Sequence, residues 1–409
     1  MKRTCMLLII AGVLLASGCD SQKPDHKELA LQRWQSARGQ MTTQMAREQL
    51  QRGELKHAED SIRSVLSHGE YAPAQVVLGQ IRLEQGQLRA AEIAFQQAQQ
   101  LQPDNAEATY GLGVVSERRG RREEALGHYE KASNINPANP EYLLAMVDTK
   151  VGLGQEKAAL EQLLEMLDGA EPSAALYMTA GRLLARQGDL ERAVEMYKQA
   201  RMLAPESTMV RETLALALLQ TNQPAQALAL FQELLQQANL ENPETAESLW
   251  FYELGQGDCY AAMGEYHKAQ RCYETVCGMR PDDDRPWVRR ARAALQADRL
   301  EQAQAYARRA LTLDPDSDEA KMVLGYVALA TGDNVVAEQQ FRELADRTPE
   351  HAMAHCLLGQ ALEAQGQRQA ARQCYVQALS LDPEDRLAQQ LLEGVQETQV
   401  GTVAPVGAF

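Results

Sequence analysis

Residues 108–137 read ATYGLGVVSERRGRREEALGHYEKASNINP, and this stretch recurs with variations along most of the chain. It aligns with the stretch before it, which ends at Pro103, at a shift of 34 residues. The same frame continues in both directions and divides the chain into ten repeats, which begin at residues 39, 72, 106, 140, 174, 208, 250, 284, 318 and 352. A fixed period of this length is typical of repeat proteins, in which each repeat packs on its neighbours.

Four positions of the repeat have a preferred residue type. Position 20 is alanine in all ten repeats, position 8 is small in nine, position 15 is glycine in eight, and position 24 is aromatic in seven. Glycine can end a helix because it adopts the left-handed conformation, and a proline after the second helix prevents its continuation. Small residues at positions 8 and 20 let two antiparallel helices approach, and the ring at position 24 fills the space beside them.

This pattern resembles the tetratricopeptide repeat family over about residues 38–385. The resemblance implies an all-α fold, a right-handed superhelical solenoid of about ten antiparallel helix hairpins. The match is weakest in repeats 4, 6 and 8, where Leu163 and Ala307 replace the ring and Asn222 and Asp298 replace the glycine.

The ends of the repeat array, residues 39–385, are expected to carry capping helices. Residues 27–38 can form an N-terminal helix that buries Trp34 on the first repeat, and residues 386–397 carry leucines at helical spacing that suit a lid on the last one. Residues 398–409 lack periodicity, which predicts a flexible tail.

Eight extra residues, NPETAESL at 242–249, interrupt the spacing between repeats 6 and 7. Asn242 followed by Pro243 is typical of a helix start. We therefore expect the first helix of repeat 7 to extend backwards over residues 242–249, and a plain loop is the alternative.

The first 18 residues have the parts of an export signal, with Lys2 and Arg3 before an apolar run that ends at Leu15. The run is shorter than the roughly 20 residues that span a bilayer. Small residues then lead to Cys19, which resembles the lipidated cysteine of bacterial lipoproteins, although Ala16 stands where that family usually has leucine. An ordinary secretory signal is the alternative.

Lipidation at Cys19 would make residues 19–26 a tether to a membrane of the bacterial cell envelope. Asp20 after the lipidated cysteine resembles a signal that retains lipoproteins in the inner membrane of some bacteria, facing the periplasm. Where that rule does not apply, the outer membrane or the cell surface is expected.

The composition limits the classes of partner. The formal net charge of −15 argues against nucleic acid, which needs a basic face, and the 45% hydrophobic residues can support a core. Five cysteines remain after residue 19, sparse and late in the chain, which makes a disulfide framework unlikely to define the fold.

No motif predicts an enzyme, a cofactor or a metal site. His351 and His355 are four residues apart, but Ala352 stands where a zinc protease of the HExxH kind needs glutamate. Gly111 and Gly113 begin like a nucleotide-binding loop, yet the third glycine and the preceding strand are missing.

In the family, the first helices line a concave groove, and positions 2, 5, 9, 12 and 13 face into it. Their spacing of three and four residues does put them on one helix face. Arginine and tyrosine in such a groove are typical anchors of protein partners. The candidate groove residues are Tyr110, Met178, Arg182, Arg186, Phe251, Leu254, Arg285, Arg292, Met322, Tyr326 and Leu329.

The sequence thus predicts a non-catalytic, lipid-anchored adaptor that binds a protein or an extended peptide, with or without acidic segments. Similarity to exported repeat lipoproteins suggests a role in assembling a cell-envelope system such as a pilus, secretion or polysaccharide-export system. An adaptor that docks cell-wall hydrolases or proteases is one alternative. An enzyme subunit with a site in repeats 7–10, which hold all five late cysteines, is another.

Overall fold

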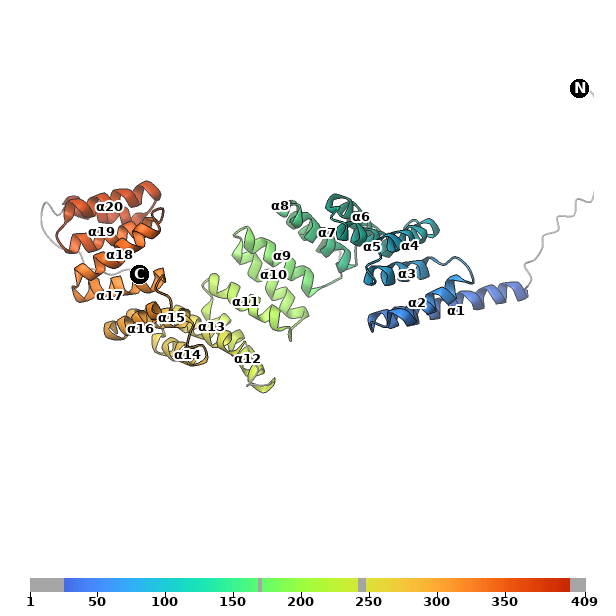
Figure 1. Ribbon diagram of the computed structural model, residues 1–409, viewed down its shortest axis with the longest axis horizontal. Helices are drawn as coiled ribbons and strands as arrows, with labels where there is room; N and C mark the ends of the chain where they lie inside the picture. Colours follow the sequence, from blue (N-terminus) through green and yellow to red (C-terminus); the bar gives the residue numbers. More distant parts are fainter. Residues whose placement is uncertain (1–25, 168–170, 242–247, 398–409) are drawn as a thin grey trace, which may run out of the picture. The chain divides into compact units, whose positions relative to one another are not determined.

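The computed structural model describes residues 26–167, 171–241 and 248–397 (Figure 1). Within these ranges there are 21 helices and no β-strand. Twenty of the helices alternate as the first and second members of ten hairpins, and one more helix follows the last hairpin. The predicted all-α fold of stacked helix hairpins is therefore confirmed.

The helix bounds follow the repeat frame. The first helices are α1 (His26–Gln51), α3 (Ala72–Glu84), α5 (Ala106–Arg118), α7 (Pro140–Gly152), α9 (Ala174–Arg186), α11 (Thr208–Gln220), α13 (Leu249–Ala262), α15 (Asp284–Gln296), α17 (Asp318–Thr331) and α19 (Ala352–Ala364). The second helices are α2 (Leu55–Leu66), α4 (Leu88–Leu101), α6 (Arg122–Ile135), α8 (Glu156–Leu167), α10 (Leu190–Leu203), α12 (Pro224–Glu241), α14 (Tyr266–Met279), α16 (Leu300–Leu313), α18 (Asn334–Arg347) and α20 (Arg368–Leu381), and the last helix is α21 (Arg386–Glu397).

The hairpins belong to two compact units. Helices α1–α8 lie in the unit Met1–Pro172, and α9–α21 lie in the unit Ser173–Phe409. Within each unit, every second helix packs on its own first helix and on the first helix of the next hairpin. Some first helices also contact one another directly, as α3 and α5 do in the first unit and α15 and α17 in the second.

An aromatic ring lies directly on a glycine backbone in most hairpins. A Cβ atom built on Gly113 would lie 2.5 Å from the ring of Tyr129, and the corresponding distance from Gly257 to the ring of Tyr273 is 2.4 Å. These rings belong to position 24 and the glycines to position 8 of the same repeat. Because no side chain fits in that gap, the small residue lets the two helices of the hairpin approach closely. In repeat 4 the larger Val147 faces the ringless Leu163, and both are fully buried.

A residue with positive φ ends each first helix at position 15. In the third repeat this residue is Gly120, with φ of 76°, and the N–H of Arg121 donates to the carbonyl oxygen of Ser116 at 2.9 Å. Asn222 and Asp298, the two departures from glycine, adopt the same conformation, with φ of 56° and 57°. Asparagine and aspartate tolerate the left-handed region better than other side chains do. The turn is therefore kept where the sequence pattern is weakest.

The N-terminal capping helix differs from the prediction. Residues 27–38 are not a separate helix but the first part of α1, which continues without a break into the first repeat. The second helix of that hairpin, α2, has only 12 residues against the 26 of α1, so the N-terminal part of α1 extends past its partner. Trp34 is consequently 58% exposed instead of buried on the first repeat, and its ring contacts the guanidinium of Arg38 at 5.4 Å.

The insertion at residues 242–249 also differs from the prediction. Ser248 is in a turn and α13 begins at Leu249, so a helix that runs without a break from residue 242 into α13 is excluded. Residues 242–247 lie outside the described part of the chain. The helix before them, α12, is itself longer than usual, with 18 residues where α10 has 14. Pro243 follows in the sequence, and a proline cannot continue a helix.

The last helix, α21, covers the tenth hairpin. Val395 is 7% exposed and belongs to the cluster that holds Phe341 and Tyr375, with Leu391 and Leu392 packed against it. The predicted tail at residues 398–409 lies outside the described residues.

We predict that Gly113→Ala lowers the free energy of unfolding by about 1–3 kcal/mol, because the new methyl group overlaps the ring of Tyr129 and the helices must separate. Chemical denaturation followed by circular dichroism measures this loss. Adding Tyr129→Leu, which imitates the pair Val147 and Leu163, should make the double variant more stable than the sum of the two single losses.

The matched control is Gly127→Ala in α6, the second helix of the same hairpin. Gly127 is exposed, and a Cβ atom there would meet nothing within 4 Å. Alanine favours helix over glycine by about 1 kcal/mol, so this variant should be as stable as the parent or more so. Equal losses in both variants would contradict the role given to the ring contact.

Candidate partner-binding surface

The eleven candidate groove residues all reach the surface. The four arginines are exposed, and the seven apolar or aromatic residues are half-buried. Tyr110 lies on α5 in the first compact unit, and the other ten lie on α9, α13, α15 and α17 in the second. The first helices thus show a face that mixes apolar side chains with guanidinium groups.

Most of the half-buried residues give one side to the core. Leu254 packs on the cluster that contains Tyr273, and Met322 and Leu329 pack on the cluster that contains Phe341. The ring of Tyr326 lies 5.7 Å from that of Phe341. These residues therefore keep a fixed position while part of each side chain remains accessible to a partner.

Tyr110 belongs to a stack of three tyrosine rings. Its centroid lies 5.4 Å from that of Tyr129 and 5.0 Å from that of Tyr142. Burial and the charge of Glu141 raise the pKa of Tyr110 well above its usual range. The hydroxyl group therefore stays protonated far above neutral pH and can donate a hydrogen bond.

The sequence analysis predicted only part of an aromatic cluster at the start of α13. Phe251 was a candidate, but its neighbour Trp250 was not, and their ring centroids lie 6.0 Å apart. The guanidinium of Arg280 lies 4.5 Å from the ring of Trp250, and that of Arg285 lies 5.8 Å from it. The sequence run Trp250–Tyr252 was the available signal. Arg280 directly follows α14, and Arg285 lies on α15. Only the folded chain brings these two arginines to Trp250.

The arginines of α15 pair with carboxylates of the same chain. Arg285 donates through Nε at 2.9 Å and through Nη2 at 2.6 Å to the two oxygens of Asp283. Arg292 lies 3.8 Å from Glu319, and both side chains are more than 60% exposed. Arg285 therefore already neutralises a carboxylate next to it in the sequence, and the pair Arg292–Glu319 is loose and open to solvent.

Arg289 of α15 pairs with a carboxylate of α13. Its Nη1 atom lies 2.7 Å from both carboxylate oxygens of Asp258, which also accepts a hydrogen bond of 2.8 Å from the hydroxyl of Tyr273. Burial raises the pKa of the Asp258 carboxyl, and the charge of Arg289 opposes this rise. The contact ties the surface of α15 to the core ring of the previous hairpin.

Met178, Arg182 and Arg186 lie on α9, and the two arginines are one helical turn apart. Both arginines are exposed, and both also interact with other residues of the chain. Glu212 on α11 accepts a hydrogen bond of 2.6 Å from the hydroxyl of Tyr252.

The late cysteines are poor nucleophiles. Burial raises the pKa of Cys259, Cys272 and Cys356 to about 12 and that of Cys277 to about 11. The thiolate, which is the reactive form, is therefore scarce at neutral pH. Cys374 also has a pKa raised by burial.

No group of three or more His, Cys, Asp or Glu side chains is arranged to hold a metal ion in the described ranges. His355, one of the two histidines considered as metal ligands, has its Nε2 atom 2.9 Å from the carbonyl oxygen of Pro349. Its imidazole is thus engaged with the backbone that precedes its own helix.

The proposed lipidation site, Cys19, and the proposed sorting residue, Asp20, lie outside the described residues, as does the signal segment before them. Among the helices that the structure does describe, none is both long and apolar enough to span a membrane.

Family comparison identifies the repeat directly. Models of the tetratricopeptide repeat match residues 76–140, 144–208, 254–318 and 288–352, and further models of the same repeat match residues 184–246 and 352–385. Together these ranges cover well over half of the chain.

The curated relatives share only part of their length with this chain. A peroxisomal targeting signal receptor of Kluyveromyces lactis is 22% identical over 263 residues, which are 64% of this chain and 39% of the receptor. A protein CTR9 homolog of Arabidopsis thaliana is 24% identical over 30% of this chain and 12% of its own length. The human protein O-mannosyl-transferase TMTC1 is 25% identical over 51% of this chain and 23% of its own length. The chain thus spans less than half of each of these relatives.

Solved structures of the same repeat are also similar. A tetratricopeptide repeat protein from Parabacteroides merdae aligns over 71% of this chain and 98% of its own, with 16% identity and a TM-score of 0.44. YrrB, described as a tetratricopeptide repeat protein with an unusual peptide-binding site, aligns over 49% of this chain and 99% of its own, with 20% identity and a TM-score of 0.36.

We predict that Arg289→Met lowers the free energy of unfolding by about 1–3 kcal/mol at pH 7, because it leaves the Asp258 carboxylate without its cation. Loss of the cation raises the pKa of Asp258 further above its unfolded value. Above about pH 4, Asp258 then binds its proton more tightly in the folded state than in the unfolded state. The loss of stability should therefore grow as the pH rises.

Arg292→Met on the same helix is the matched control. Its ion pair with Glu319 is loose and exposed, so its loss should cost less than about 0.5 kcal/mol with little dependence on pH. Denaturation curves of both variants at pH 4 and pH 7 provide the comparison. A loss in Arg289→Met that is the same at both pH values would contradict the assignment to Asp258.

Proposed function

Because this chain belongs to the tetratricopeptide repeat family, we propose that it is a non-catalytic, lipid-anchored adaptor that binds a protein or an extended peptide on the exposed face of its first helices. The observation that carries the proposal is the accessibility of all eleven candidate groove residues, four of which also pack on core clusters. Half-buried rings and exposed arginines are the side chains that most often dominate protein interfaces.

The proposal includes no reaction at the cysteines of repeats 7–10. Their pKa values are raised by burial, so a thiolate nucleophile would need a nearby base or cation to form. An enzyme subunit with a cysteine site is therefore the less favoured reading, and the weak similarity to part of a mannosyl-transferase does not alter it.

The cellular setting rests on the N-terminal sequence. The apolar segment before Cys19 and the small residues that precede it support lipidation, and Asp20 supports retention in the inner membrane. A tethered repeat array of this kind would assist assembly of a cell-envelope system, such as a pilus, secretion or polysaccharide-export system. This last step rests on analogy with other exported repeat lipoproteins, since a fold alone does not fix a function.

We predict that Cys19→Ser releases the protein into the soluble fraction or leaves its signal segment uncut, because serine cannot form the thioether bond to the lipid. Fractionation of cells followed by mass determination of the mature protein measures both outcomes. Cys5→Ser, the same exchange inside the apolar segment, is the control and should leave processing unchanged. A processed, membrane-bound Cys19→Ser protein would exclude this cysteine as the anchor.

The partner is proposed to carry an acidic segment that contacts α9. Two guanidinium groups one helical turn apart can bind carboxylates in the same partner segment, and Met178 beside them offers an apolar contact. A sheltered charge-assisted hydrogen bond contributes roughly 1.5–3 kcal/mol, and an exposed one contributes much less.

We predict that the double variant Arg182→Glu/Arg186→Glu binds the partner at least about tenfold more weakly, with helix content and melting temperature nearly unchanged. The partner is first captured from native membranes with the tethered protein, and affinity is then measured by calorimetry. Arg368→Glu/Arg372→Glu on α20 is the control, since it makes the same charge change at the same spacing on an exposed second helix. Unaltered affinity in the folded α9 variant, or an equal loss in the control, would remove α9 from the binding surface.

A further inference from the structure

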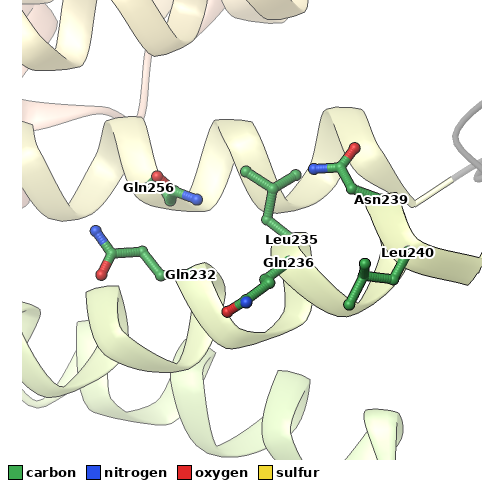
Figure 2. Close-up of a pocket in the computed structure, with 6 residues that line it drawn as sticks. All are labelled: Gln232, Leu235, Gln236, Asn239, Leu240 and Gln256. Atoms are coloured by element: carbon green, nitrogen blue, oxygen red, sulfur yellow. The ribbon is translucent and has the colours of Figure 1, made fainter.

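An open hollow of about 430 Å³ lies between α12 and α13, and none of the candidate groove residues lines it (Figure 2). Its lining consists of two leucines and four side-chain amides: Gln232, Leu235, Gln236, Asn239, Leu240 and Gln256. Five of these residues belong to α12, and Gln256 belongs to α13. Asn239 and Leu240 lie in the part of α12 that exceeds the 14 residues of α10, so the added length of this helix helps to form the hollow.

The α12 residues form one stripe along the helix. They are spaced by three and four residues, which places them on the same face, and Figure 2 shows Gln256 on the neighbouring helix across from Gln232. With a rise of about 1.5 Å per residue, Gln232 and Asn239 are separated by about 10 Å along the axis. An extended peptide covers that distance in about three residues.

Gln256 occupies a position that is apolar in most other repeats. It is position 7, where the other repeats except the eighth have Met45, Leu78, Leu112, Met146, Ala180, Leu214, Leu324 and Leu358. The eighth repeat has Arg290 there, and Arg290 pairs with Glu274 at 2.8 Å and lies 4.3 Å from the ring of Tyr306.

Gln256 has no such partner. Gln256 is 8% exposed. No hydrogen bond joins its side-chain amide to another residue within the described ranges. The amide of Gln256 is not among the fully buried polar groups that lack a partner in the described ranges, which fits its place in the lining of the hollow. As part of the lining of the hollow, the same amide can serve a bound molecule.

The chemistry of the lining selects for a neutral ligand. None of the six lining residues is charged, and Glu233, next to them on α12, pairs with Arg201 at 3.0 Å. A side-chain amide donates and accepts at once, which matches the alternating N–H and C=O groups of a peptide backbone. Leu235 and Leu240 offer apolar contacts to side chains of the same segment. No aromatic ring lines the hollow, which makes a sugar a less suitable ligand.

We propose that the hollow between α12 and α13 is a second binding site, which takes an extended, uncharged peptide segment with an apolar side chain over Leu235 or Leu240. Gln256 and Gln236 hydrogen-bond the backbone of that segment from opposite sides. This site goes beyond the proposed adaptor surface, because its residues come from a second helix and from position 7 instead of positions 2, 5, 9, 12 and 13.

The test uses the full chain in detergent and a library of N-acetylated, C-amidated eight-residue peptides in which leucine or valine alternates with serine, asparagine or glycine. Fluorescence anisotropy should find members that bind with a Kd below about 1 mM. Gln256→Met and Gln236→Leu should each weaken that binding about five- to tenfold. Gln199→Leu, an exposed glutamine on α10, is the matched control and should leave it unchanged.

Melting temperatures separate a binding role from a structural one. Because the amide of Gln256 has no partner within the described part of the chain, Gln256→Met should melt at the same temperature as the parent or higher. A clear fall in the melting temperature of Gln256→Met would mean that the amide supports the fold, and would overturn the proposal.

Three further results would also overturn it: no library member binding below about 1 mM, equal weakening in Gln199→Leu, or displacement of the peptides by N-acetylchitotriose, which would point to a sugar. The Arg182→Glu/Arg186→Glu variant tests whether this site is separate from the adaptor surface. It should bind the captured partner more weakly and still bind the library peptides. Failure at one site therefore leaves the other testable.

Discussion

The contact on which the fold depends is an aromatic ring pressed on a glycine backbone. In the second hairpin the ring of Phe95 lies so close to Gly79, and to Gly111 of the next hairpin, that a Cβ atom on either glycine would approach it to 2.5–2.6 Å. One ring thus joins a first helix, its second helix and the first helix that follows. Repetition of this contact along the chain gives most hairpins the same packing, so no single large core is needed.

The same contact decides which face of a first helix remains outside. Positions 6 and 8 lie against the rings. Side chains at positions 2, 5 and 9, such as Phe251, Tyr110 and Tyr326, contact a ring with one side and reach the surface with the other. Where the ring is tyrosine, its hydroxyl also reaches towards that outer face: Tyr129 donates to Glu117 at 2.6 Å and Tyr375 to Glu363 at 2.9 Å. The buried ring therefore fixes the orientation of a carboxylate at the edge of the proposed partner-binding surface.

The interruption between the sixth and seventh repeats changes both the packing and the chemistry available. The longer α12 carries leucines and amides along one stripe and faces Gln256 of α13. Gln256 departs from the apolar residues that most other repeats have at position 7. Departures from a local pattern of this kind are expected at sites that bind something.

The sequence by itself determined the hairpin fold, the place of each turn and the helix face that meets solvent, because these depend on short-range patterns that recur every 34 residues. It could also identify Asn222 and Asp298 as unusual turn residues, although their positive φ is known only from the structure. Tertiary structure alone decided that Trp34 is exposed, that Arg289 pairs with Asp258, and that α12 continues as far as Glu241, directly before the extra residues. The physical reason is that each of these outcomes depends on which side chains of separate helices come within contact distance, and a periodic pattern carries no information about the contacts that break it.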